Sequence, residues 1–452
     1  MADAFSPRAL LAILKSRLGS ARRLWVAYSG GLDSTVLLHA TAEVRGALDC
    51  AVHAVHLEHG LHPDSAAWAD HCRATCTALD VPLTERSLAI QRAAGESLEA
   101  VAREARQRAF AGLLTPGDVL VTGQHRDDQA ETLLLALLRG SGPAGLAAMP
   151  VMADLGGGRL LRPLLGFSRA ELAAYARRTG LRWIDDPSNA DTAFDRNFLR
   201  LRVLPLLRGR WPSLDLTLAR SAAHCAEAAT LLDAAADDWL AGQGGPRPGT
   251  LSVTGLRALD PPRCRAVLRR WLARGGFRPP SSVVLERVLS EVLPAAPDRS
   301  PLVAWPGCEI RRHRDALFAL APLPPAPSPR LQLRWDGTAP LPLPAGLGEL
   351  VLPGPAASAA PIPGMRVVFR WPGLRCRAAA GPSRSLKQLY QQADMPAWLR
   401  PYVPLMLIDG RLAAVAGVAQ CEGRLGGLQW RGHPWHRLGL PVADGPRRRA
   451  GR

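Results

Sequence analysis

Short apolar runs alternate with amphipathic stretches over the first part of the chain. Four runs rich in apolar and β-branched residues predict strands at 24–28, 50–57, 81–84 and 119–122. After them, apolar positions recur at spacings of three and four residues, which predicts helices at about 35–45, 64–79, 97–114 and 127–139. Strands that alternate with helices are typical of a parallel, doubly wound sheet. The pattern therefore predicts a Rossmann-like α/β domain at 1–215.

The rest of the chain has a different pattern. Helical periodicity dominates 216–320, with helices expected at about 221–240, 262–274 and 282–293. A Pro/Ala-rich stretch at 321–363 indicates a linker region with some strand structure. A small α+β C-terminal domain is expected at 364–440, where the runs 405–408 and 412–418 around Asp409-Gly410 predict a hairpin. The Arg-rich end, 441–452, is expected to be a basic disordered tail.

Length and charge narrow the function class. A chain of 452 residues exceeds a single core, so several domains are expected. Lys plus Arg number 56 against 39 acidic residues, a net charge of +17, which favours a nucleic-acid partner. Coding bias explains why Arg replaces Lys almost everywhere but not the net excess. No apolar run approaches a membrane span and no signal peptide is present, so we expect a cytoplasmic protein with no membrane partner.

The eight cysteines do not form a metal-binding pattern. No CxxC pair exists, and Cys72 and Cys76 lie one helical turn apart beside His71 without zinc-spaced partners elsewhere. Buried thiols on a helix face are the favoured interpretation for this pair. Since scattered cysteines in a cytoplasmic protein are usually reduced, we expect all eight to be free thiols.

The sharpest motif follows the first predicted strand and leads into a helix. Its residues are Ser29, Gly30, Gly31, Leu32, Asp33 and Ser34, followed by Thr35. Free N–H groups at a helix start, two glycines and three hydroxyls make an anion site, although an ordinary Gly-rich turn is the alternative. A Walker A loop needs a lysine that is absent here. Asp33 instead suits a Mg²⁺ ion beside phosphates, and the run resembles the pyrophosphate loop of N-type ATP pyrophosphatases.

Two further segments are ambiguous when taken alone. His56 ends the second predicted strand, where it could line a nucleotide pocket or simply be structural. Glu99, Arg103 and Arg106 share one face of the helix at 97–114. That face is either a solvated salt-bridged surface or a phosphate-binding one, because Arg is well suited to phosphate.

The segment 123–132 (GQHRDDQAET) follows the fourth predicted strand and opens a helix. Asp127 and Asp128 at this helix start can cap it, which is the structural alternative. Adjacent carboxylates beside His125 favour a metal or acid–base role instead.

Together these motifs resemble the tRNA(Ile)-lysidine synthetase family. The pyrophosphate loop, the segment around His56, the helix at 97–114 and the segment 123–132 occur in that family's order and spacing, followed by RPLL (162–165), DDPSN (185–189) and RNFLR (196–200). The loop alone also fits thiouridine, GMP and argininosuccinate synthetases; thiouridine synthetases of one kind carry CxxC pairs, absent here. Segments 385–390, 395–400 and 403–405 resemble the family's C-terminal domain. Glu58 and His62 depart from its usual residues.

The resemblance implies a reaction and roles for particular residues. ATP, L-lysine and the isoleucine tRNA with a CAU anticodon would give lysidine at the wobble cytidine, with AMP and pyrophosphate released. The loop residues 29–34, with His56 and Arg103, would bind ATP, and Asp33 and Asp128 would hold Mg²⁺. The remaining expected roles are catalysis by Asp33, His125, Asp127, Asp128 and Arg106, tRNA or substrate contacts by Arg196, Arg200, Lys387 and Arg400, and pairing of the substrate ammonium with Glu131 or Asp185.

Two other functions stay open on the sequence. One is a non-catalytic tRNA-binding protein, which the intact loop and the intact segment 123–132 disfavour. The other is an ATP pyrophosphatase acting on a small amide, which the basic second half of the chain disfavours. A homodimer is possible but not indicated by any motif.

Overall fold

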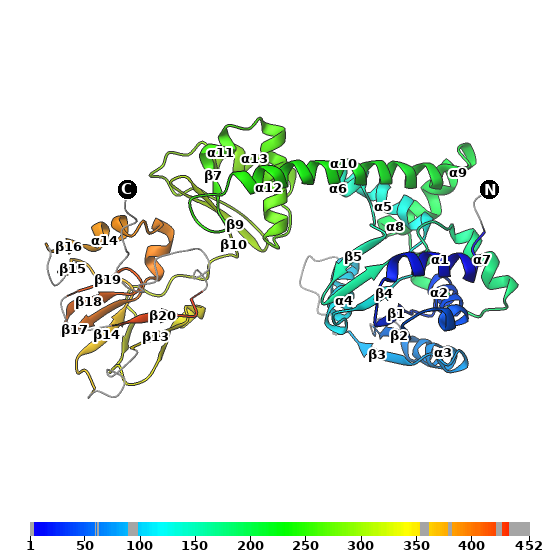
Figure 1. The fold of residues 1–452 in the computed structure, drawn as a ribbon, viewed down its shortest axis with the longest axis horizontal. Coiled ribbons are helices and arrows are strands. Elements are labelled where there is room, and N and C mark those ends of the chain that lie inside the picture. The colour runs from blue at the N-terminus through cyan, green and yellow to red at the C-terminus, as the bar shows by residue number, and fades with distance from the viewer. Residues whose placement is uncertain are drawn as a thin grey trace. The chain divides into compact units, whose positions relative to one another are not determined.

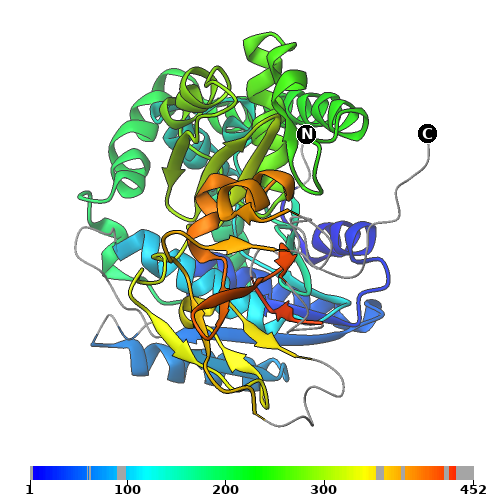
Figure 2. The same cartoon turned by 90° about the vertical axis from the view of Figure 1, so that its left-hand side faces the viewer.

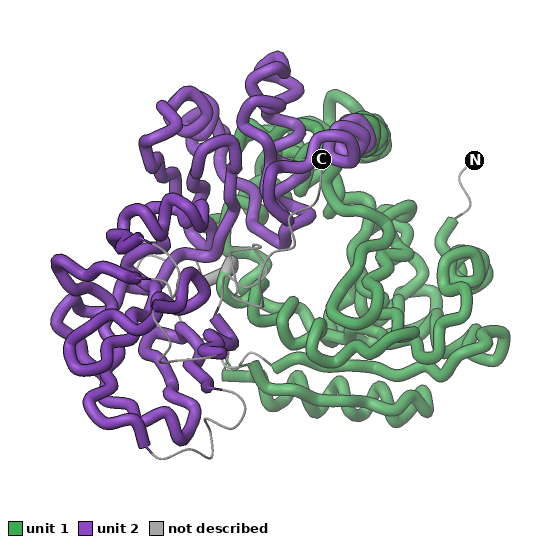
Figure 3. Tube along the Cα trace, turned by 60° about the vertical axis from the view of Figure 1, so that its left-hand side comes forward, with its two compact units in different colours: residues 1–231 green, residues 232–452 purple. Residues whose placement is uncertain are grey.

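The computed structural model describes residues 4–58, 60, 63–88, 98–352, 361–377, 382–421 and 427–433. The chain divides into two compact units, residues 1–231 and 232–452, which are coloured separately in Figure 3. Within the described residues, no helix is both long and apolar enough to cross a membrane. Each unit is described by itself below.

Unit 1 is built on the six-stranded sheet A (Figure 1). Five of its strands are parallel, and β5 pairs antiparallel with β6 at one edge. In spatial order the strands are β3 (Leu83–Ser87), β2 (Ala51–Glu58), β1 (Arg23–Ala27), β4 (Asp118–Val121), β6 (Gly158–Leu161) and β5 (Met152–Leu155). Because strand order reverses between β1 and β4, their carboxyl ends form the place where α/β sheets bind ligands.

Helices cover both faces of sheet A. One core joins Leu14 of α1, Leu37 of α2 and Leu172 of α7 to Val26 of β1, and a second joins Phe110 of α4 to the other face. The α-helices of unit 1 before the long helix are α1 (Pro7–Leu18), α2 (Leu32–Val44), α3 (Ser65–Ala78), α4 (Leu98–Leu113), α5 (Arg126–Leu138), α6 (Pro143–Leu146), α7 (Arg169–Arg178), α8 (Asp195–Phe198) and α9 (Leu204–Arg210). The one-turn 3₁₀ elements are η1 (Arg45–Ala47) and η2 (Pro187–Ala190), and η3 (Leu199–Val203) is π-helical.

The predicted α/β domain is confirmed. All four predicted strands and all four predicted helices are present, with ends shifted by at most three residues. Sequence analysis gave no element for α1, α7, β5 or β6. The two latter strands have only four residues each, which is too short for a periodic signal.

The first part of unit 2 contains helices and an additional antiparallel sheet. The long α10 (Leu214–Gly242) leads into it, followed by α11 (Val253–Arg257), α12 (Pro261–Arg274), α13 (Ser282–Arg287) and the π-helical η4 (Val288–Val292). The helical prediction is confirmed. Sheet B was not predicted; its spatial order is β7 (Leu251–Ser252), β10 (Ala316–Leu320), β9 (Cys308–His313) and β8 (Leu302–Trp305). Leu317 of β10 and Val267 of α12 share its core.

The C-terminal part, yellow to red in Figure 2, contains three small antiparallel sheets. Sheet C has the order β11 (Gln332–Arg334), β14 (Met365–Val368), β17 (Leu405–Ile408), β18 (Arg411–Val415) and β19 (Ala419–Gln420). Sheet D has β12 (Leu341–Pro342), β13 (Glu349–Val351) and β20 (Gln429–Arg431), sheet E has β15 (Arg375–Cys376) and β16 (Arg384–Ser385), and the helical elements are η5 (Pro344–Gly346), α14 (Leu386–Gln392) and η7 (Ala397–Tyr402).

The predicted hairpin is present as β17 and β18. Asp409 and Gly410 connect the strands with φ values of 49° and 76°, the two positive values that a type I′ turn requires. The predicted basic tail, 441–452, lies outside the described residues.

The predicted linker at 321–363 differs most from the structure. Strands β11, β12 and β13 lie within it, and Trp335, Leu347 and Leu350 are buried in the same core as Val367. Some strand structure was expected here, but the positions of the strands were not predicted because each is only two or three residues long.

One expectation about the cysteines is wrong. Cys376 and Cys421 form a disulfide, with Cα atoms 5.2 Å apart. Their separation of 45 residues gives no sign of this proximity, which arises only when β15 lies beside β18. The other six cysteines are free, and Cys72 and Cys76 are buried on α3, as predicted.

Candidate functional site

The pyrophosphate-loop segment lies at the carboxyl end of β1, where α2 begins. Gly31 is the N-cap of α2 and provides no side-chain cap, so the first N–H groups of the helix are available to an anion. The Ser34 hydroxyl accepts from the Ser29 N–H at 3.2 Å and donates to the Gly31 carbonyl at 3.0 Å. The Ser29 and Ser34 hydroxyl oxygens lie 3.1 Å apart. The two serines therefore hold the loop together from inside.

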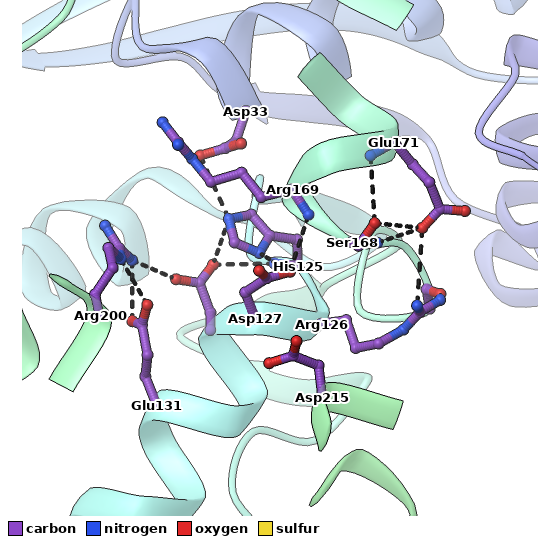
Figure 4. Close-up of polar contacts among 12 residues, drawn as sticks. Asp33, His125, Arg126, Asp127, Glu131, Ser168, Arg169, Glu171, Arg200 and Asp215 are labelled. Atoms are coloured by element: carbon purple, nitrogen blue, oxygen red, sulfur yellow. Dashed lines mark hydrogen bonds and ion pairs between the residues drawn. The ribbon is translucent and has the colours of Figure 1, made fainter. Parts of the chain in front are cut away.

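The segment after β4 packs directly on this loop. A Cβ atom at Gly123 would lie 3.1 Å from the carbonyl carbon of Asp33 and from the Ser34 nitrogen, so a larger residue would press on the loop backbone. His125 then caps α5, is 1% exposed, and lies between the two helix starts. Its Nε2 atom is 3.6 Å from Asp33 Oδ2 and 3.5 Å from Asp128 Oδ2 (Figure 4). Its Nδ1 atom is 3.7 Å from Asp127 Oδ2, so the structure brings together four of the predicted catalytic residues.

His125 lies in a strongly acidic environment. Burial alone lowers the pKa of His125, but the contact with Asp33 and the charges of Asp128, Asp33 and Asp127 outweigh it and raise the pKa. Two buried atoms at this point have no hydrogen-bond partner among the described residues: Asp33 Oδ1 and His125 Nδ1. His125 Nδ1 faces Asp127, whose Oδ2 atom is 3.7 Å away. Unpartnered buried polar atoms are rare, so Asp33 Oδ1 indicates where a ligand would bind.

The carboxylates of α5, in contrast, are engaged. Asp128 Oδ2 accepts the N–H of His125 at 3.0 Å, so Asp128 does cap the start of α5, as the structural alternative expected. Its Oδ1 atom pairs with Arg200 at 3.0 Å. Asp127 Oδ2 accepts the N–H of Arg169, at the start of α7, at 2.9 Å, and its Oδ1 pairs with Arg208 at 2.9 Å. These bonds fix the first turn of α5 to its neighbours.

Glu131, one turn further along α5, is held by two arginines. It is 1% exposed, and its oxygens pair with Arg196 at 2.8 Å and with Arg200 at 2.6 Å. Arg200 lies in the π-helical η3, a rare conformation that is frequent at functional sites. Burial would lower the pKa of Arg200, but its bond to Glu131 and the charges of Glu131, Asp128 and Asp33 raise it. Arg196 and Arg200 therefore bind α5 carboxylates in this structure.

The other predicted ATP-binding residues lie around the loop. His56, 6% exposed at the end of β2, has its Nδ1 atom 2.9 Å from the Tyr28 carbonyl oxygen just before the loop. Arg103 and Arg106 lie on α4 without an acidic partner among the described residues. The Arg106 residue is exposed in part, but protein atoms pack around its guanidinium. This burial lowers the pKa of Arg106, and the nearby charge of Arg103 lowers it further. The side chain of Glu99, together with His59 and His62, lies outside the described part of the chain.

The two predicted tRNA-contacting residues of unit 2 differ in exposure. Lys387 is exposed on α14. Arg400 is half-buried: its Nη2 atom donates to the Met395 carbonyl at 3.2 Å, and the guanidinium lies 5.7 Å from the Tyr390 ring centroid. Lys387 is thus available to bind a phosphate, whereas Arg400 would first have to break its hydrogen bond to Met395.

Two arginines of unit 1 lie near the site but were not predicted as site residues. Arg208 on α9 links Asp127 to Asp215 at the start of α10. Its spacing of eight residues from Arg200 in a helical segment was the available signal. Arg162, noted only within the RPLL segment, is 9% exposed and donates to the Pro150 carbonyl at 2.8 Å, while its Nε atom has no partner among the described residues. The nearby charge of Arg103 adds to burial in lowering the pKa of Arg162.

The site fits Mg²⁺ only as an ion shared with a ligand. No group of three or more His, Cys, Asp or Glu residues among the described ones is arranged to hold a metal. Mg²⁺ in nucleotide sites is usually bound by one or two carboxylates together with phosphate oxygens and water. The unpartnered Asp33 Oδ1 matches that requirement, and Asp128 lies across His125 from it.

Comparison with known proteins agrees with this geometry. Family models match a PP-loop domain at residues 5–207, a TilS substrate binding domain at 251–318 and a TilS substrate C-terminal domain at 365–431. The chain is 45% identical to the tRNA(Ile)-lysidine synthase of Methylococcus capsulatus, over 87% of this chain and 90% of that protein. It is 44% identical to those of Alkalilimnicola ehrlichii (90% and 92%) and Escherichia coli O157:H7 (89% and 94%). The chain belongs to the tRNA(Ile)-lysidine synthase family, and it is an ATP-using tRNA-modifying ligase.

Proposed function

We propose that this enzyme attaches L-lysine to C2 of the wobble cytidine in the isoleucine tRNA with a CAU anticodon. ATP first adenylates the C2 oxygen, with pyrophosphate released, and the lysine amine then displaces AMP. The change would convert recognition of the codon AUG to AUA. The observation that carries the proposal is the meeting of Asp33, His125 and Asp128 at the open start of α2, in a chain that is 45% identical to a lysidine synthase over most of its length.

The residues divide the work by position. The uncapped N–H groups at the start of α2 would hold the leaving pyrophosphate. Arg103 and Arg106, which have no acidic partner among the described residues, would neutralise the α-phosphate. Phosphoryl-type transfer needs positioning and charge neutralisation more than a protein nucleophile, and the site supplies both.

Asp33 and Asp128 would hold the Mg²⁺ ion, whose contribution is to neutralise charge that develops on the phosphates. His125 orients these two carboxylates from its buried position between them. Glu131 is a candidate for the substrate ammonium, which requires that one of its two arginine partners be exchanged for the ligand.

The basic second half would bind tRNA. The net charge of +17 and the two TilS family-model matches in unit 2 support this, with Lys387 an exposed candidate contact. A cytoplasmic location and a homodimer stay predictions.

The decisive test is incorporation of radiolabelled lysine into tRNA. The full-length protein is incubated with ATP, Mg²⁺, labelled lysine and a CAU-anticodon isoleucine tRNA transcript, with a methionine tRNA transcript as control. Lysine incorporated into the isoleucine tRNA alone, with one AMP formed per lysine, is the expected result. AMP formation without lysine transfer would identify a different acceptor for the activated base and contradict the proposal.

A further inference from the structure

The peptide group between Gly30 and Gly31 is held by two donors from different parts of unit 1. The Gly30 carbonyl accepts the Ile184 N–H at 2.9 Å and the Thr35 hydroxyl at 3.2 Å. A trans peptide is planar, and its C=O and N–H point in opposite directions. Two donors that fix the carbonyl of Gly30 therefore also fix the direction of the Gly31 N–H.

That N–H belongs to the open start of α2. Gly31 is half-buried, has φ and ψ of −74° and 163°, and caps the helix without a side chain. No described residue accepts its N–H. The direction of this one donor thus decides whether the loop presents it to a phosphate.

Gly30 is closely surrounded and has a backbone conformation that favours glycine. Gly30 has φ +82°, and a Cβ atom there would lie 2.7 Å from Ile184 Cδ1 and 3.2 Å from Cys72 Sγ. Ile184 thus contacts Gly30 through both its backbone and its side chain. The loop is held between α3 on one side and the segment around Ile184 on the other.

Thr35 is 2% exposed, and its N–H and hydroxyl are both directed at the loop backbone. Its side chain also interacts with the Tyr28 hydroxyl. Its N–H donates to the Gly31 carbonyl at 2.9 Å, as its hydroxyl donates to that of Gly30. A hydroxyl used in this way has no proton left for a phosphate. The sequence suggested that the Thr35 hydroxyl donates to a bound anion. In the structure this hydroxyl instead shapes the loop.

We propose that Thr35 is a positioning residue for nucleotide binding: with the Ile184 N–H it holds the Gly30–Gly31 peptide so that the Gly31 N–H is directed at the pyrophosphate end of ATP. The inference rests on the ATP use of the proposed function but not on the identity of the acceptor. It adds to the site a buried hydroxyl that does not touch the ligand.

Thr41 provides a matched control in the same helix. It is 0% exposed, and its hydroxyl donates to the Leu37 carbonyl at 2.7 Å, away from the loop. Thr35→Val and Thr41→Val therefore each remove one buried hydroxyl bonded to a backbone carbonyl and keep the side-chain shape. Only the first releases the Gly30–Gly31 peptide.

The experiment measures affinity of the full-length protein for α,β-methylene-ATP with Mg²⁺ by calorimetry, alongside Tm. Thr35→Val should weaken binding by roughly 2- to 12-fold, the factor equivalent to one net hydrogen bond. Thr35→Ser, which keeps the hydroxyl, and Thr41→Val should stay within about twofold of the native protein. In turnover, Thr35→Val should raise KM for ATP more than it lowers kcat.

Equal affinities for Thr35→Val and Thr41→Val would overturn the inference, as would a loss of affinity in Thr35→Ser equal to that in Thr35→Val. If a valine variant does not fold, the pair Thr35→Ala and Thr41→Ala makes the same comparison. Nucleotide binding with no lysine transfer by the native protein would contradict the proposed function and leave this inference standing, so the two failures are distinguishable.

Discussion

The two helix starts that meet at His125 are built for different purposes. Both α2 and α5 follow neighbouring parallel strands, and both carry aspartate in the first turn. At α2 the helix is uncapped, and Asp33 keeps a buried oxygen without a partner among the described residues. At α5, Asp127 and Asp128 each use both oxygens on protein donors. Similar motifs thus produce an open ligand site in one case and a fixed framework in the other.

This difference shows how a site can be preorganised and still keep free donors and acceptors for a ligand. The bonded carboxylates of α5 hold their positions because removing any of them leaves a half-buried arginine or an N–H with fewer partners. Asp33 makes fewer bonds to the protein, so it contributes little to the free energy of unfolding. Its proposed role is to bind the ligand. Activity and stability should therefore respond separately at the two helices.

The largest expected effect is on turnover, from Asp33→Asn. AMP release should fall by about 100-fold or more, because a metal-binding carboxylate stabilises several kcal/mol of phosphate charge. Tm should stay close to that of the native protein. AMP release measured in parallel with thermal unfolding checks this, with the exposed Asp238→Asn on α10 as a control. Near-normal turnover would show that the open oxygen is not the functional one.

Glu131→Gln tests the bonded carboxylates of α5. Replacing this buried carboxylate leaves Arg196 without a carboxylate partner and Arg200 with Asp128 alone, so the free energy of unfolding should drop by about 3 kcal/mol. Denaturant unfolding gives the value. The exposed Glu227→Gln, which removes a partner of His224 at 3.8 Å, should change stability by less than about 0.5 kcal/mol. If Glu131→Gln instead left stability unchanged and raised KM for lysine, the two arginines would not form a fixed clamp.

Removal of Mg²⁺ should show whether the ion is held through Asp33 at the start of α2. Chelation should weaken α,β-methylene-ATP binding by about tenfold in the native protein, since phosphates and metal are bound as a unit. In Asp33→Asn the same chelation should have little further effect. An equal loss in both proteins would mean that the ion is held without Asp33.

A smaller effect is expected from Asn197, which connects the segment after Ile184 to α8. Its Nδ2 atom donates to the Ser188 and Asp191 carbonyls, each at 2.9 Å. Asn197→Asp removes both donors and should raise KM for ATP a few-fold by loosening this segment beside the loop, an effect of about 1 kcal/mol. Asn189→Asp, in the same segment, is the matched control and should leave KM unchanged.

The smallest effect concerns a closed cluster in unit 2. Asp394 pairs with Arg247 at 2.8 Å, His313 at 2.9 Å and Arg314 at 2.8 Å. Burial would raise the pKa of Asp394, but the bonds to Arg247 and His313 outweigh it and lower the pKa. Its stabilisation is therefore present above the ordinary Asp pKa, near 4, and is lost as pH falls through the lower folded value. Asp394→Asn should flatten the acid dependence of unfolding below about pH 5; an unchanged profile would count against this cluster.

The disulfide and the packing of 321–363 show why parts of unit 2 were not predicted in detail. Cys376 and Cys421 meet only because β15 lies beside β18 and Cys421 directly follows β19. The strands within 321–363 gain their stability from pairing with β14 and β20 and from burial of Trp335 and Leu350, not from local preference. Unit 1 was predicted better because each strand and helix there is long enough to show its own period.

The sequence by itself determined the βα order of unit 1, the loop at 29–34, the acidic turn at 125–128 and, through their order and spacing, the family. These are local signals, carried by glycine conformation, helix-start chemistry and hydrophobic period. Only the tertiary structure decided which carboxylate stays open, that Arg196 and Arg200 pair with Glu131, and that Thr35 and Ile184 hold the Gly30 carbonyl. The physical reason is that a hydrogen bond is assigned by distance and direction across elements far apart in the chain, and the same residue type serves a ligand or the fold according to its neighbours.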